Sequence, residues 1–201
     1  VLLDGELSGR LGDFGLARLY DRREGPRTTH VVGTMGYLAP ELARTGKATT
    51  ATDVFSFGVF LLEVACGRRP VEPDAAAPEE VVLADWVLQK WRSGELPEAV
   101  DPVLGRVPAG EAEMVLGLGL HCCHPAPAAR PSMRQVAQVL EGDAPLPPLS
   151  AEHLNASVLQ MQLTGGFDQH VLVSSWRSST ATTTESPPQT SESLKSSVPF
   201  S

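Results

Sequence analysis

Hydrophobic positions along the chain predict a mainly helical domain that opens with a short β-hairpin. The apolar run at residues 1–3 is typical of a buried strand, Asp4-Gly5 signals a turn, and residues 9–12 form the expected returning strand. Residues 13–49 contain five glycines and two prolines without a sustained hydrophobic period, which predicts a loop. A loop of this length inside a compact domain is generally functional or disordered.

Helices are predicted over most of residues 52–141. Residues 52–66 are apolar nearly all round, which is typical of a helix buried at the centre of a helical domain, and Gly67 follows as its C-terminal cap. Amphipathic spacing predicts three further helices, at residues 79–91, 111–123 and 131–141. The last has Pro131 in the favoured first-turn position and an apolar stripe of Met133, Val136, Ala137 and Leu140. The predicted fold class is mainly α, of the α+β type.

The last part of the chain has a different composition. Residues 143–201 include the proline-rich run at 145–148, and 15 of the 28 residues from Ser174 to Ser201 are Ser or Thr. Such a segment offers too little apolar surface to offset the entropy of ordering it, so a disordered tail is predicted there. Residues 1–142 are expected to form one domain.

Composition and charge argue against several classes of protein. A hydrophobic content of 42% in 201 residues is enough for a core, whereas a net charge of −8 and 5% aromatic residues argue against nucleic-acid binding. The longest apolar stretch, residues 54–66, is too short to span a bilayer. Three cysteines give no disulfide framework and fit a reducing compartment. The chain begins on an apolar run without an initiator methionine, so it is expected to be a piece of a longer protein.

The residues that carry chemistry lie in the predicted loop and after it. Asp13-Phe14-Gly15 follows the second strand, and a carboxylate in this position suits Mg²⁺ held against phosphate oxygens. Three residues alone are weak evidence, because Asp-x-Gly turns are common. The ordered set that follows adds the weight: Gly33-Thr34-Met35-Gly36-Tyr37, Ala39-Pro40-Glu41, Asp53-Val54-Phe55-Ser56-Phe57-Gly58 and Arg130-Pro131.

The order and spacing of these elements resemble the C-terminal lobe of a eukaryotic protein kinase. More narrowly, the chain resembles plant receptor-like Ser/Thr kinases of the L-type (legume) lectin-domain group. The runs that carry this narrower resemblance are residues 11–18, 29–34, 36–41 and 48–70. The resemblance covers residues 1–142 and implies a partial kinase domain: a short hairpin, an activation segment and a helical base.

The resemblance implies roles for the residues of the activation segment, which would span residues 13–41. Asp13 corresponds to the carboxylate that chelates the Mg²⁺ bridging the ATP phosphates, and Phe14 to the ring that packs beneath it. Thr28 and Thr29 lie where such kinases are often phosphorylated. Nearby arginines are either partners for a phosphate or an ordinary solvated basic face; they are Arg10, Arg18, Arg22, Arg23 and Arg27.

Two further matches concern structural support. Glu41 and Arg130 correspond to a buried ion pair that ties the activation segment to the helical base, and removal of one partner would strand a charge. Asp53 corresponds to a helix-start carboxylate that holds the backbone of the catalytic loop. It also falls in the capping-box pattern of residues 50–53, and both readings of Asp53 are compatible.

The activity implied by the resemblance is transfer of the ATP γ-phosphate to protein Ser/Thr with Mg²⁺. Thr34 corresponds to the residue that marks Ser/Thr rather than Tyr specificity, and Gly36 and Tyr37 lie with it in the substrate loop. The parent protein is expected to be anchored in the plasma membrane through a segment absent here. Its kinase would face the cytoplasm, and this portion itself would be soluble. Protein substrates and ATP are the expected partners, and no nucleic acid is.

Most of the catalytic set of a kinase is not found in these 201 residues. Phosphoryl transfer needs a Gly-rich phosphate cover, a lysine with its helix glutamate, and the aspartate and asparagine of the catalytic loop. The chain alone is therefore predicted to be inactive. The alternative hypothesis is a non-catalytic kinase-like module that uses its helical lobe as a docking surface.

Two patterns in the predicted helix at 111–123 do not indicate ligand sites. His121-Cys122-Cys123-His124 are adjacent on a helix and point in different directions, so they cannot surround one metal ion. Gly117-Leu118-Gly119 lacks the third glycine of a dinucleotide signature and lies inside a helix. The helix end at residues 118–124 is expected to pack in the core.

Overall fold

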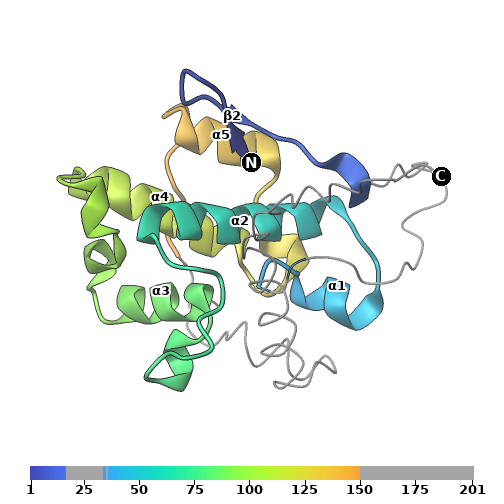
Figure 1. Cartoon of the computed structure of the whole chain (residues 1–201), viewed down its shortest axis with the longest axis horizontal. Coiled ribbons are helices and arrows are strands. Elements are labelled where there is room, and N and C mark those ends of the chain that lie inside the picture. The colour runs from blue at the N-terminus through green and yellow to red at the C-terminus, as the bar shows by residue number, and fades with distance from the viewer. Residues whose placement is uncertain (17–33, 35, 150–201) are drawn as a thin grey trace, which may run out of the picture.

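The computed structural model describes residues 1–16, 34 and 36–149, and within them a two-stranded hairpin precedes five α-helices. Helix α2 (Thr50–Cys66) runs through the middle of the molecule, and α4 (Ala109–Cys122) packs along it (Figure 1). Helix α3 (Leu83–Arg92) lies on one side of α2, and the hairpin and α5 (Met133–Leu140) lie on the other. The predicted class, mainly helical with one small antiparallel sheet, is confirmed.

The hairpin consists of β1 (Leu2–Leu3) and β2 (Gly9–Arg10). Its turn is built on Asp4, whose carboxylate accepts the backbone N–H groups of Glu6 (3.0 Å) and Ser8 (2.9 Å). These bonds stabilise the charged form and lower the pKa of Asp4. Strand β2 is two residues shorter than predicted, because β1 offers only two residues to pair with. The paired residues are Leu2 with Arg10 and Leu3 with Gly9.

Helix α1 (Pro40–Thr45) lies inside the predicted loop, so the loop assignment is wrong for these residues. Pro40 presets the first turn, and Gly46, at φ 64°, ends the helix in the left-handed conformation. Six residues are too few to show a hydrophobic period. Helix α2 begins two residues earlier than predicted, because the Thr52 hydroxyl accepts the N–H of Thr49 (3.1 Å) and completes a capping box there. The box proposed for residues 50–53 is therefore wrong by one residue.

Two other helices begin elsewhere than predicted. Helix α3 starts at Leu83 rather than at residue 79, because residues 78–80 form a separate 3-10 turn and Val82 is extended opposite Val71. Helix α4 spans residues 109–122, one to two residues before its predicted bounds. Short 3-10 turns join the larger elements: η1 (Phe14–Leu16), η2 (Pro78–Glu80), η3 (Leu96–Ala99), η4 (Pro102–Leu104) and η5 (Pro127–Ala129).

Helix α5 is shorter than predicted and faces differently. Ser132 caps it, because its hydroxyl accepts the N–H of Gln135 (3.4 Å) and the Gln135 side chain accepts the N–H of Ser132 (2.8 Å). Pro131 therefore precedes the cap and is not in the first turn. The predicted apolar stripe is wrong in part: Met133 and Leu140 expose 44% and 40% of their surface. The buried pair is Val136 and Val139.

Buried side chains form two clusters, one on each side of the α2–α4 pair. The larger lies among α2, α3 and α4, and its most completely buried side chains are Phe55, Leu62, Leu83, Val87 and Leu116. The smaller joins α2 and α4 to α5, and consists of Val54, Leu118, Cys122, Val136 and Val139. Within the described part of the chain, no helix has the length and apolar character needed to cross a membrane.

Glycines set the close approach of α2 and α4. A Cβ atom at Gly58 would lie 2.5 Å from Cβ of Cys122 and 2.9 Å from the carbonyl oxygen of Gly119. A Cβ atom at Gly119 would lie 2.5 Å from Cδ2 of Leu62. Real Cβ atoms essentially never come this close, so the observed crossing requires glycine at residue 58, whereas at residue 119 the Leu62 side chain would have to move.

The folded domain extends beyond the predicted boundary at residue 142. Ala144 and Leu146 pack against the smaller cluster, and Leu149 packs against the larger one. Residues 143–149 therefore pack against the helical base, although composition places them in the predicted disordered tail. The prediction of disorder for the remaining tail concerns residues 150–201, which lie outside the described residues.

Candidate functional site

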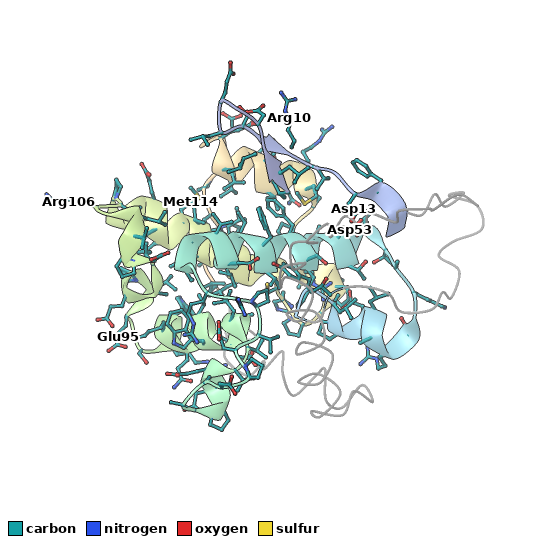
Figure 2. All side chains as sticks on the ribbon, in the orientation of Figure 1. Arg10, Asp13, Asp53, Glu95, Arg106 and Met114 are labelled. Atoms are coloured by element: carbon teal, nitrogen blue, oxygen red, sulfur yellow. The ribbon has the colours of Figure 1, made fainter. Side chains whose placement is uncertain are left out.

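Asp13 lies three residues after strand β2 and immediately before the 3-10 turn η1. Its backbone is left-handed, with φ 60°, a conformation that Asp and Asn adopt more readily than most residues. Its side chain is exposed, and Figure 2 labels it on the segment between β2 and the residues that are not described. An exposed carboxylate on a tight turn is free to meet a hard cation such as Mg²⁺.

Apolar side chains of the N-terminal hairpin and of η1 are exposed. Val1, Leu3 and Phe14 expose 65%, 67% and 64% of their surface. Phe14, predicted to pack beneath Asp13, is thus not covered in this chain. Large apolar side chains exposed in this way are typical of surfaces that bind another part of a protein when they form one patch.

The predicted substrate loop begins with a tight turn at Thr34. The N–H of Tyr37 donates to the carbonyl of Thr34 (3.2 Å), and Gly36 has φ 91°. A Cβ at Gly36 would lie 2.7 Å from Cβ of Pro70, so both the conformation and the space require glycine. The Thr34 side chain is exposed, where a bound peptide could reach it.

Tyr37 anchors this loop to α2 at two points. Its hydroxyl hydrogen bonds to the carboxylate of Glu63, and the Ser56 hydroxyl donates to its carbonyl (2.8 Å). Burial, and then the Glu63 carboxylate, raise the pKa of Tyr37, which therefore stays protonated as a donor. Sequence analysis missed Ser56 and Glu63 as site residues. The available signal was that both are polar residues in an otherwise apolar helix.

Arg130 and Glu41 form a bidentate ion pair. The guanidinium donates to the two carboxylate oxygens of Glu41 at 2.6 and 2.8 Å, and the side chains are 1% and 12% exposed. Arg130 also donates to the carbonyls of Ala51 (2.8 Å) and His124 (2.7 Å) and lies over the ring of Phe55 at 5.0 Å. One buried side chain thus joins α1, the start of α2 and the segment before α5.

Asp53 lies in the first turn of α2, as Figure 2 shows. Partial burial of its carboxyl raises its pKa, although the residue is exposed overall. It takes no part in the observed capping box, which uses Thr49 and Thr52. Its predicted support of a catalytic loop stays a prediction, because no such loop is identified in the 201 residues.

The predicted phosphorylation region is only partly described. Thr28 and Thr29 lie outside the described residues, as do four of the five arginines near them: Arg18, Arg22, Arg23 and Arg27. The fifth, Arg10, is described and donates to the carboxylate of Asp4 (3.1 Å). Arg10 therefore braces the hairpin turn.

The run His121-Cys122-Cys123-His124 ends α4, and its side chains have separate partners. Nε2 of His121 donates to the carbonyl of Pro147 (2.8 Å), and Nδ1 of His124 accepts the N–H of Ala126 (3.0 Å). The thiol of Cys123 points to the carbonyl of Phe55 (3.9 Å). Among the residues that the structure describes, no group of three or more His, Cys, Asp or Glu side chains is placed to hold a metal.

The three thiols should be inert while the chain is folded. Burial raises the pKa of Cys66 and Cys122 to about 12 and raises that of Cys123 as well, from an ordinary value of 9.0. We expect iodoacetamide at pH 8 to label them at least about tenfold more slowly than in urea, because the thiolate is the nucleophile. Mass spectrometry counts the labelled thiols, and equal rates in both states would contradict the burial.

The same burial predicts how stability depends on pH. Unfolded thiols ionise near pH 9, whereas the folded thiols remain protonated to higher pH. The raised folded pKa therefore leaves stability unaffected below pH 9 and lowers it progressively between pH 9 and about 12.

Residues 1–140 match the protein kinase domain family. The chain is 58% identical over 173 residues to the L-type lectin-domain containing receptor kinase SIT2 of Oryza sativa subsp. japonica. It is 59% identical over 170 residues to the L-type lectin-domain containing receptor kinase IV.1 of Arabidopsis thaliana. The alignments cover 86% and 84% of this chain but 26% and 25% of the relatives. The chain thus spans about a quarter of their length.

A solved structure with a similar fold is the pseudokinase domain of BIR2, described as an immune regulator of the RLK/Pelle family. The TM-score is 0.58 at 30% identity, covering 82% of this chain and 45% of that one.

The alignment of 173 residues with the Oryza sativa relative cannot fit within residues 1–142, so sequence similarity also reaches into the predicted tail. The chain belongs to the protein kinase family, in the group that contains the L-type lectin-domain receptor kinases of plants.

Proposed function

We propose that this chain is the C-terminal-lobe portion of a receptor-like protein kinase that transfers the ATP γ-phosphate to Ser or Thr of proteins. The parent would act at the cytoplasmic face of the plasma membrane, as the receptor kinases to which the chain is similar suggest. The observation that carries the proposal is the anchoring of residues 34–41. Tyr37 is held by Glu63 and Ser56, and Glu41 by Arg130.

This anchoring prepares a surface for an extended peptide. Tyr37 is fixed on α2 and Glu41 is held by the ion pair, so the described residues 36–41 are held in one geometry before a substrate arrives. Preorganisation of this kind lowers the entropy lost on binding. The Thr34 hydroxyl, exposed on this loop, is proposed to lie beside the acceptor hydroxyl and to favour Ser or Thr over the longer Tyr.

The chemistry of Asp13 fits the Mg²⁺ that the family implies. Mg²⁺ takes oxygen ligands and is commonly held by one or two carboxylates together with substrate phosphates. Asp13 supplies such an oxygen on an exposed turn. When bound beside Asp13, the metal would supply positive charge that neutralises the phosphates of ATP. Asp13 would orient that complex, while Phe14 would pack against another part of the kinase.

A second candidate function is a non-catalytic binding module. It is favoured by the pseudokinase whose fold this chain resembles, and by the catalytic residues not found in the 201 residues. The presence of Asp13, with Thr34 and Glu41, favours the catalytic proposal. On either proposal, the 201 residues alone transfer no phosphate.

A chimera separates the two proposals. The aligned segment of the kinase domain of the Arabidopsis relative would be replaced by residues 1–201. We expect the chimera to transfer radioactive phosphate from ATP to Ser and Thr peptides at a rate of the same order as the relative, and not to Tyr peptides. The 201 residues alone, as control, should give no transfer.

Each outcome of this experiment is decisive. A folded chimera without activity supports the non-catalytic module, and transfer to Tyr peptides overturns the assignment of Thr34. Circular dichroism and a cooperative melting transition establish that the chimera is folded. Activity of the 201 residues alone would contradict the inactivity expected of a chain without a catalytic-loop aspartate.

A further inference from the structure

Residues 143–149, here called the strap, turn back onto the helical base after α5. The N–H groups of Asp143 and Ala144 both donate to the carbonyl of Gln138, at 2.8 and 3.1 Å. Gly142 makes the turn in the left-handed conformation, with φ 81°. The chain after α5 is therefore directed across α4 rather than away from it.

Side chains of the strap reach both hydrophobic clusters. Leu146 joins the smaller cluster and Leu149 the larger one. Between them, the carbonyl of Pro147 accepts a hydrogen bond from Nε2 of His121 on α4 (2.8 Å). The strap is thus held by apolar contacts at two points and by a hydrogen bond between them.

A glycine in α4 makes the space for Leu146. A Cβ atom at Gly117 would lie 2.7 Å from Cδ2 of Leu146, and Gly117 is buried. Glycine inside a helix is less favourable than alanine, so the position is used for contact and not for helix stability. The Leu146 side chain occupies the notch that Gly117 leaves.

Helix α5 needs such support because few of its own side chains are buried. Only Val136 and Val139 of this helix are buried, and Met133 and Leu140 are largely exposed. The strap adds Leu146 to the same cluster from the far side. A cavity of about 520 Å³ has Arg130 and Pro131 on its lining together with Ala144 and Pro147 of the strap. The strap and the segment that carries Arg130 therefore face the same cavity.

We propose that the strap is a clamp that locks α5 onto α4 through the Leu146–Gly117 contact. The clamp is a conformational device of the lobe and does not depend on the proposed kinase activity.

A double-mutant cycle on the full 201-residue chain tests the clamp. The variants are Leu146→Ala, Gly117→Ala and both together, with Leu140→Ala as a matched control for loss of an exposed leucine on α5. We expect Leu146→Ala to lower Tm by about 4–8 °C. Gly117→Ala alone should lower Tm or leave it unchanged. When Leu146 is already alanine, Gly117→Ala should instead raise Tm by about 2–4 °C.

Hydrogen exchange distinguishes a clamp from general loss of stability. In Leu146→Ala and in Gly117→Ala, the amides of Asp143 and Ala144 should exchange at least about tenfold faster. The amides of Val136 and Val139 should follow them, and should be accelerated more than those of α3, such as Val87. Leu140→Ala should alter none of these rates.

Additive effects of the two substitutions on Tm would overturn the proposal, because the Leu146–Gly117 contact would then carry no coupling. Equal acceleration of exchange in α3 and α5 would also overturn it, since the strap would then act on the whole domain. Should Leu146→Ala fail to fold, Gly117→Ala still decides the question, because it keeps every apolar group and displaces only Leu146.

Discussion

Replacing Arg130 by alanine lowers the free energy of unfolding by about 3–5 kcal/mol, because it leaves the Glu41 carboxylate without its partner in a nearly dry site. The Arg130 side chain is 1% exposed and that of Glu41 12% exposed, so little water can replace the lost bonds. The carbonyls of Ala51 and His124 lose their donors as well. Urea unfolding followed by tryptophan fluorescence measures the change.

Matched variants separate the buried pair from loss of an arginine as such. Arg134→Ala removes an exposed arginine of α5 and should change stability by less than about 0.5 kcal/mol. Combining Arg130→Met with Glu41→Gln should cost less than the sum of the single changes, because no charge is then left unpaired. A loss below about 1 kcal/mol for Arg130→Ala would mean that the pair is open to solvent.

In the active chimera, Asp13→Asn reduces turnover by about 10²–10³-fold or more, with Tm unchanged. Asn keeps the size, one carbonyl oxygen and the tolerance for a left-handed backbone at φ 60°, but it loses the charge that Mg²⁺ prefers. Removal of one key electrostatic group commonly costs this much in rate. The exposed position of Asp13 makes a stability effect unexpected.

The control is Asp74→Asn, which removes an exposed carboxylate in a loop and should leave turnover unchanged. Raising the Mg²⁺ concentration should restore part of the Asp13→Asn activity if weak metal binding is the cause. Turnover retained in Asp13→Asn would show that the carboxylate does not hold the metal, and the functional proposal would lose its main chemical support.

A feature of the fold can be predicted from the sequence where a residue type has one physical use at its position. The central helix α2 was found because no surface helix is apolar on every side. Glu41 and Arg130, named from a resemblance, lie 89 residues apart in sequence and at hydrogen-bond distance in the structure. The predicted start of α5 at Pro131 is wrong, because Ser132 and Gln135 have the spacing of a capping box and place the cap after the proline.

Other features are set by tertiary structure and leave little local signal. The docking of Leu146 depends on the space that Gly117 leaves in a helix packed elsewhere, and a proline-rich run in the sequence predicts only an extended chain. Likewise, the partnership of Tyr37 with Glu63 joins a loop to a helix 26 residues away. The composition of residues 143–149 therefore gives no sign that Leu146 and Leu149 pack against the helical base, and the predicted boundary lies at residue 142.

Because glycines set the close crossing of α2 and α4, a change inside the lobe would shift residues at its surface. A methyl group at Gly58 would meet the carbonyl oxygen of Gly119 at 2.9 Å, so the two helices would have to part. Because α2 also carries Ser56 and Glu63, the hydrogen-bond partners of Tyr37 would shift with it. A substitution at residue 58 or 119 would thus shift the proposed peptide-binding loop without changing any residue of that loop.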